Sequence, residues 1–93
     1  MTEDQKTFFK ELSYIQDMVV NIASCNAEKY TSIETMLKDV TYETIYRLME
    51  LLDGYRNNSI RCEIVNTISG SCINHNIELH DYCEEYLDCT DIG

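Results

Sequence analysis

The chain has 93 residues, with 17 acidic and 7 basic side chains and a formal net charge of −10. A chain of this length encloses one hydrophobic core, and a content of 44% hydrophobic residues is sufficient for it to fold. The charge argues against direct binding to nucleic-acid phosphates or to an anionic membrane surface, and no apolar run in the sequence is long enough to span a bilayer.

The first predicted element is a long helix within residues 1–27. Thr2 and Gln5 have the spacing of a capping box, which marks a helix start. Apolar residues then recur at spacings of three and four, which is the period of an amphipathic helix. This stripe consists of Phe8, Leu12, Ile15, Val19 and Ile22. Phe9 and Val20 form a second apolar edge that could pack against another copy of the chain.

Residues 32–54 show a second helical pattern, but its apolar stripe slips by one residue near Thr41. Because threonine is also a good N-cap, the pattern favours a short helix over 32–39 followed by a longer one over 42–53. Gly54 stands where a helix C-terminus needs a left-handed residue. A single kinked helix is the alternative.

The third region, residues 59–75, has the features of a β-hairpin. Apolar and polar residues alternate from Ile60 to Ile64, which is typical of a half-buried strand. A Ser-Gly-Ser turn at 69–71 follows, and residues 72–75 could form the returning strand. The predicted fold class is therefore a single α+β domain with three to four helices packed on a short antiparallel hairpin, in the order α-α-α-β-β-α.

A last helix is predicted over residues 76–88, capped by Asn76 and followed by a flexible tail at 89–93. Residues 61–93 contain seven acids and one base. Six of these acids fall on the face opposite the apolar one and are the predicted partner-binding residues. They are Glu78, Asp81, Glu84, Glu85, Asp88 and Asp91. Such a row could imitate the charges of a nucleic-acid backbone, or it could be an ordinary solvated face.

Four potential zinc ligands follow one another as Cys72-x2-His75-x4-His80-x2-Cys83. Cysteine and histidine at short spacing are what tetrahedral zinc requires. The gap between the two pairs is much shorter than in zinc fingers, and Cys83 also suits the predicted core face, so no metal is the favoured prediction.

No catalytic motif is present in the sequence. The three glycines form no phosphate-binding loop, and acids surround Cys83 and Cys89 where a reactive thiol would need positive charge. The five cysteines and the absence of a signal-like N-terminal run predict a cytoplasmic protein with reduced thiols. We therefore expect a non-enzymatic protein without a cofactor.

The functional prediction is a small acidic protein that binds and inhibits a basic protein partner, such as a nucleic-acid-processing enzyme, through the last helix. Phage-encoded inhibitors and immunity proteins paired with toxins are similar in outline. One alternative is a homo-oligomeric structural or regulatory domain, and a second is a small zinc-stabilised module.

Overall fold

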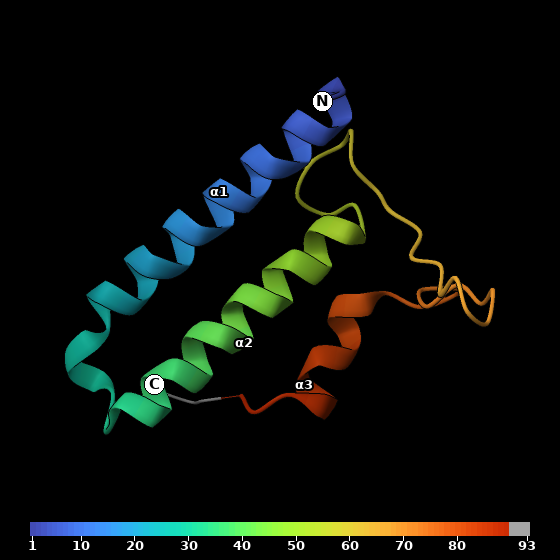
Figure 1. Cartoon of the computed structure of the whole chain (residues 1–93). Helices are drawn as coiled ribbons and strands as arrows, with labels where there is room; N and C mark the ends of the chain where they lie inside the picture. The colour runs from blue at the N-terminus through green and yellow to red at the C-terminus, as the bar shows by residue number, and fades with distance from the viewer. Residues whose placement is uncertain (90–93) are drawn as a thin grey trace.

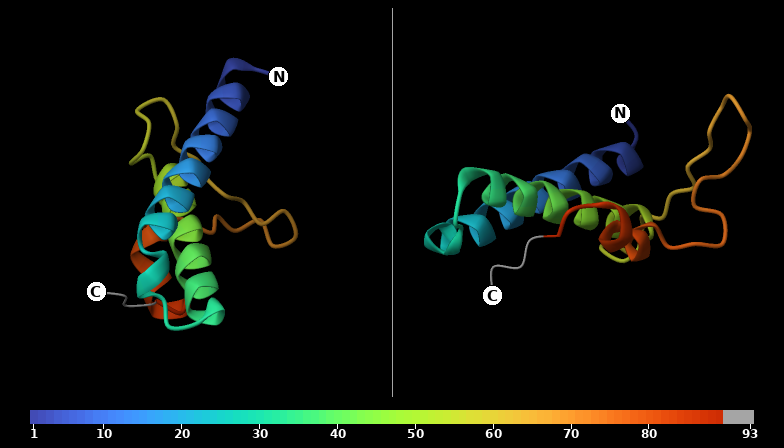
Figure 2. Two further views of the ribbon diagram at one scale, coloured as in Figure 1. Left: turned by 90° about the vertical axis from the view of Figure 1, so that its left-hand side faces the viewer. Right: turned by 90° about the horizontal axis from the view of Figure 1, so that it is seen from below.

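Two long helices lie side by side and antiparallel (Figure 1). The computed structural model describes residues 1–89. In this part of the chain, helix α1 spans Glu3–Cys25 and helix α2 spans Ile33–Leu52, and the 3-10 turn η1 at Ala27–Lys29 lies between them. The chain then runs irregularly past the N-terminal end of α1 and returns to the opposite side of α2 (Figures 1 and 2).

Side chains at both ends of α1 set its length. The predicted capping box is confirmed, because Thr2 Oγ1 accepts from the Gln5 backbone N–H at 3.1 Å and Gln5 Oε1 accepts from the Thr2 N–H at 2.7 Å. At the other end, the Asn26 amide nitrogen donates to the Ile22 carbonyl. Both ends of the helix thus gain partners for backbone groups that a helix leaves unpaired.

Helix α2 is one continuous helix, so the prediction of two helices separated near Thr41 is wrong. The Thr41 hydroxyl does not cap a new helix. It donates back to the Leu37 carbonyl one turn earlier, at 2.7 Å, and the helix continues through it. Ser32 provides the actual N-cap by accepting from the Thr35 N–H.

The core is small and lies between the two helices and the segment that follows them. Ile15 and Val19 of α1 pack with Leu51 of α2 and with Ile60. The partly buried residues around this cluster are Phe8, Leu12, Val40, Leu48 and Cys62. Ile60 therefore ties the irregular chain to the helical pair.

The prediction of an α+β fold with a β-hairpin at 59–75 is wrong. Residues 1–89 contain no β-strand or sheet, and the regular structure is helical. A single antiparallel bridge between Val65 and Cys72 is the extent of the β pairing in the described chain. The alternation from Ile60 to Ile64 does follow burial, since Ile60 is buried and Cys62 packs against the core, but it does not lead to a strand. The residues beyond it that would continue and return the hairpin, Val65, Ile68 and Ile73, are all exposed.

One side chain explains why the bridge does not extend into a ladder. Asn74 Oδ1 accepts from the Ile64 backbone N–H at 2.9 Å, and its Nδ2 donates to the Cys62 carbonyl at 2.7 Å. The amide of Asn74 thus occupies the backbone groups that a returning strand would have paired with. The segment folds back as a loop.

The C-terminal part has two short turns in place of the helix predicted over 76–88. The 3-10 turn η2 covers Leu79–Tyr82, and α3 covers Cys83–Tyr86. Asn76 does not cap a helix, since it adopts a left-handed backbone with φ of 57°. Both turns contact α2 on the side away from α1 (Figure 1). The predicted tail at 89–93 and Asp91 lie outside the described residues, apart from Cys89.

Candidate functional site

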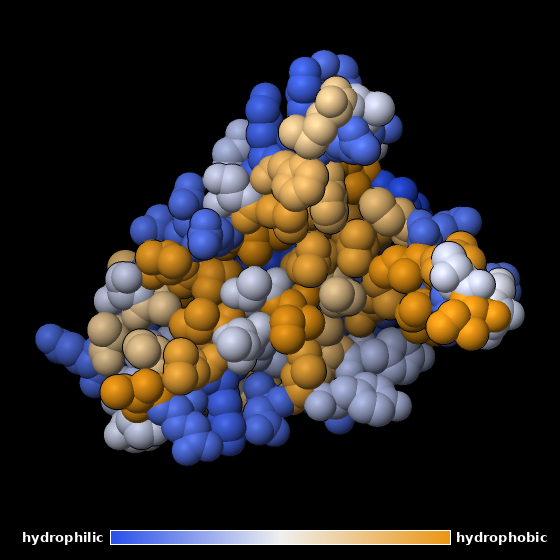
Figure 3. Space-filling model, in the orientation of Figure 1, coloured by the Kyte–Doolittle hydropathy of each residue, from blue (hydrophilic) through white to orange (hydrophobic). Residues whose placement is uncertain are grey.

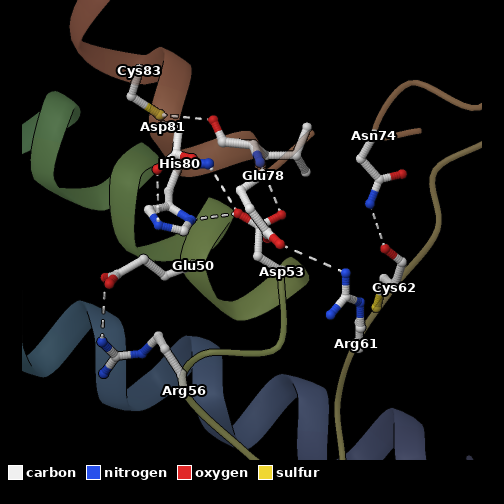
Figure 4. Close-up of polar contacts among 11 residues, drawn as sticks. Glu50, Asp53, Arg56, Arg61, Cys62, Asn74, Glu78, His80, Asp81 and Cys83 are labelled. Atoms are coloured by element: carbon white, nitrogen blue, oxygen red, sulfur yellow. Dashed lines mark hydrogen bonds and ion pairs between the residues drawn. The ribbon is translucent and has the colours of Figure 1, made fainter. Parts of the chain in front are cut away.

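A buried carboxylate at the end of α2 holds the C-terminal turns in place. Asp53 is 2% exposed and accepts from three donors (Figure 4). Its Oδ1 accepts from the Leu79 backbone N–H at 3.0 Å, and its Oδ2 accepts from the His80 backbone N–H at 3.0 Å. Nδ1 of His80 lies 2.6 Å from the same Oδ2. Asp53 therefore fixes both the start of η2 and the orientation of the imidazole.

Two aromatic rings pack against His80. The Tyr55 ring lies edge-on with its centroid 4.7 Å from that of His80, and the Tyr46 ring lies at 5.7 Å. The other ring nitrogen, Nε2, is 3.4 Å from Asp81 Oδ1. Two ring contacts and a carboxylate near each nitrogen restrict the orientation of the imidazole.

Glu78 lies beside Asp53 and His80, and Arg61 compensates its negative charge only in part. Its Oε1 is 3.7 Å from an Arg61 guanidinium nitrogen (Figure 4). Its Oε2 is buried and has no hydrogen-bond partner among the described residues. Negative charge from Glu78 is also the main cause that raises the pKa of Tyr55 above its ordinary value. Carboxylates thus outnumber cationic groups around His80.

Asp53, Glu78 and His80 form the cluster in the described chain that could hold a metal ion. One carboxylate oxygen from each acid and one ring nitrogen of His80 all lie within 4.8 Å of one another. These are nitrogen and oxygen ligands of the kind that zinc and related divalent ions accept.

The four zinc ligands considered from the sequence do not form one cluster among the described residues. They are Cys72, His75, His80 and Cys83. Cys72 donates its thiol hydrogen to Asn74 at 3.3 Å, and His75 is exposed. Cys83 is buried, its pKa is raised by burial and by Asp53, and its sulfur points to the Leu79 carbonyl at 3.9 Å. Of the four, His80 alone belongs to the cluster with Asp53 and Glu78.

The predicted partner-binding acids do not form one unpaired stripe. Glu78 faces Arg61, Asp81 faces His80, and Asp88 forms an ion pair with Lys38 of α2 at 3.3 Å. Glu84 and Glu85 are exposed on α3, and no ion pair to them forms within residues 1–89. Three of the five acids that the structure describes are therefore engaged with groups of the chain itself.

A second feature is an apolar groove of about 460 Å³ between α1 and α2. Figure 3 shows apolar side chains gathered over this seam and over the adjoining loop. The apolar residues that line the groove are Leu12, Ile15, Val19, Val20, Val40 and Leu48. Val20 on its rim is 54% exposed, and beyond it Phe9, Ile33 and Leu37 are also exposed. We call the groove formed by these lining residues the α1–α2 groove.

Comparisons with protein-family models, with curated proteins and with solved structures find no match. The function must therefore be argued from the side chains just described. No helix among residues 1–89 has the length and apolar character needed to cross a bilayer.

Sequence reasoning missed Asp53, although the sequence carries a signal for it. An acid at the C-terminal end of a helix faces the negative end of the helix dipole, which is unfavourable. Such an acid is ordinarily stabilised by water, and where it follows a helical apolar run closely enough to be buried, as Asp53 is, donors from elsewhere in the chain take the place of water. His80 was considered only as a partner for cysteines, because the sequence places Asp53 far from it.

Proposed function

We propose that this chain is a non-enzymatic binding protein whose target is a basic amphipathic helix of another protein, held in the α1–α2 groove. The observation that carries the proposal is an open apolar groove on a chain with a net charge of −10. Two antiparallel helices with an uncovered seam present the surface on which a third helix packs in a bundle.

The C-terminal part as far as Cys89 does not close the groove. The η2 and α3 turns contact α2, while the residues that line the groove come from α1 and α2. Exposed apolar side chains also stand elsewhere on the two helices, Phe9 on α1 and Ile33 and Leu37 on α2, while polar Ser13, Gln16 and Thr44 complete the groove lining. The apolar lining residues give a target helix several anchoring points spaced by helical turns.

The charge favours a basic target over a second copy. Two copies would each bring a net charge of −10, and their long-range repulsion opposes association. A basic partner is attracted by the same field, and the attraction also speeds encounter. Glu84 and Glu85, exposed and without ion pairs in the described chain, contribute to that field. Binding of this kind could inhibit a nucleic-acid-processing enzyme, whose basic surfaces serve its substrate.

The test uses a synthetic helical peptide of leucine and lysine with an apolar face, and a scrambled peptide of the same composition. Fluorescence anisotropy measures binding of each to the full chain. Val20→Gln places a polar amide on the groove rim, and Val65→Gln is the matched control, since the two valines are 54% and 53% exposed. We expect Val20→Gln to weaken binding of the amphipathic peptide about tenfold, the loss expected for one valine contact, and Val65→Gln to leave it unchanged.

Added salt should also weaken binding, because it screens the charge attraction. Equal binding of the two peptides, or equal effects of the two variants, would contradict the proposal. Light scattering on the chain without peptide measures whether the chain itself forms a dimer. A dimer that Val20→Gln dissociates would assign the groove to a second copy, which is the alternative that the exposed Phe9 and Val20 favour.

A further inference from the structure

We propose that Asp53, Glu78 and His80 form a binding site for a divalent first-row metal ion such as zinc, and that the ion fastens the C-terminal turns to the end of α2. This site is independent of the α1–α2 groove. It also differs from the set Cys72, His75, His80 and Cys83, because two carboxylates replace the three other ligands and no sulfur takes part.

The first argument is distance. Three ligand atoms that lie within 4.8 Å of one another can all be reached from a single point about 2.8 Å from each. Zinc bonds to imidazole nitrogen and carboxylate oxygen at about 2.0–2.2 Å. The Glu78 oxygen therefore has to approach by only several tenths of an ångström. His80 Nδ1 and Asp53 Oδ2, now 2.6 Å apart, have to separate to about 3.3 Å, the spacing of two ligands around tetrahedral zinc. Small rotations of the half-buried Glu78 side chain and of the His80 ring provide both movements.

The second argument is the unpaired oxygen of Glu78. Buried polar atoms are almost always hydrogen-bonded, and an exception calls for a partner such as a bound ion. Glu78 Oε2 is buried without a hydrogen-bond partner among the described residues, and it belongs to the side chain that completes the cluster. A cation supplies the missing partner.

The third argument is that the ligands are already oriented. Backbone N–H groups of Leu79 and His80 hold the Asp53 carboxylate, and the rings of Tyr46 and Tyr55 hold the imidazole. Such supporting contacts raise metal affinity by fixing the ligands before the ion arrives. On binding, the ion takes the lone pair of His80 Nδ1, and the single ring hydrogen moves to Nε2, which faces Asp81 Oδ1 at 3.4 Å.

Charge and access also suit a cation. Asp53, Glu78 and Asp81 face His80 and Arg61, so the surroundings have an excess of negative charge. Glu78 and Asp81 also line a polar cavity of about 630 Å³, which opens the Glu78 side of the cluster to solvent.

The experiment titrates the full, reduced chain with Co²⁺ as a spectroscopic substitute for Zn²⁺ and follows absorption. We expect one equivalent to bind without the near-ultraviolet charge-transfer band of cobalt bound to thiolate. His80→Asn keeps a donor toward Asp53 but removes the ring nitrogen, and Glu78→Gln removes a carboxylate of the same size. Each should lower affinity at least about tenfold, as even supporting residues do. His75→Asn and Glu84→Gln are the matched controls and should bind as the wild type does.

Thermal unfolding provides a second measurement. Zn²⁺ should raise the unfolding midpoint of the wild type and of both controls, and a chelator should reverse the rise, because an ion that binds the folded state stabilises it. Absence of Co²⁺ binding, a thiolate band at one equivalent, or wild-type affinity in both His80→Asn and Glu78→Gln would each overturn the proposal.

Discussion

The helical pair and the chain that follows it are held together by different forces. Residues 1–52 associate mainly through apolar side chains, with Ile15, Val19 and Leu51 buried between the helices. Residues 54–89 bury little apolar surface apart from Ile60 and Cys83, and single polar side chains position them. Asp53 holds the C-terminal turns, and Asn74 holds the loop. A substitution in residues 1–52 should therefore lower the stability of the whole fold. A substitution in residues 54–89 should mainly loosen the contacts around it.

The largest effect is expected from Leu51→Ala. Leu51 is fully buried at the centre of the core, and its loss leaves a cavity that costs about 3–5 kcal/mol of the free energy of unfolding. Denaturant unfolding followed by circular dichroism measures this change. The exposed Leu37 is the control, since Leu37→Ala should cost much less. Similar losses for the two variants would show that Leu51 is not at the centre of the fold.

Asp53→Ala should have a smaller and more local effect. It removes an ionised acceptor from two backbone N–H groups and from His80, which we expect to cost about 2–4 kcal/mol. Asp53→Asn keeps an acceptor oxygen and should fall between the alanine variant and the wild type.

Hydrogen exchange distinguishes this local effect from a global one. In Asp53→Ala, protection should fall at the amides of Leu79 and His80 and remain in α1. Exposed Asp17→Ala is the control and should change neither region. Equal loss of protection in α1 and η2 would show that the two regions unfold as one unit.

The smallest effect concerns a polar contact within the helical pair. The Tyr30 hydroxyl donates to the buried carboxylate of Asp39, and this hydrogen bond is the main cause that raises the pKa of Tyr30 from 10.0 to about 12. A pKa raised by folding means that the contact stabilises fully below pH 10 and is lost as the pH rises toward 12. Tyr30→Phe should cost about 1–3 kcal/mol at neutral pH, and its difference from the wild type should vanish across that interval.

Unfolding at several pH values measures this difference. Tyr42, whose pKa is also raised to about 12, is present in both proteins and cancels in the comparison. A difference that does not change between pH 8 and pH 12 would contradict the assigned contact.

The contrast between the two regions also explains what could be predicted from the sequence. Helix α1 could be predicted because its start and its buried face depend on neighbours within a few residues, as Thr2 and Gln5 show. A single helix over this region was only the alternative prediction, because Thr41 can either cap a helix or bond back within one, and tertiary packing decides between them.

The second region depends on contacts between residues far apart in the sequence. Alternating residues at 60–64 predicted a strand, but whether a strand forms depends on a partner, and Asn74 takes that place. Asp53 meets Leu79 across 26 residues, and although its place after an apolar run suggests that it needs donors, no local pattern identifies which donors those are. For the same reason, the sequence identified His80 as a potential ligand but not the two carboxylates beside it.

The position of Asp53 also implies an order of folding. The connection between α1 and α2 is short, so the helical pair closes a small loop and should form early. The C-terminal turns dock by closing a loop of 26 residues onto a carboxylate that is in place only when the last turn of α2 exists. In pulse-labelled refolding, amides of α1 and α2 should therefore gain protection before those of residues 79–87.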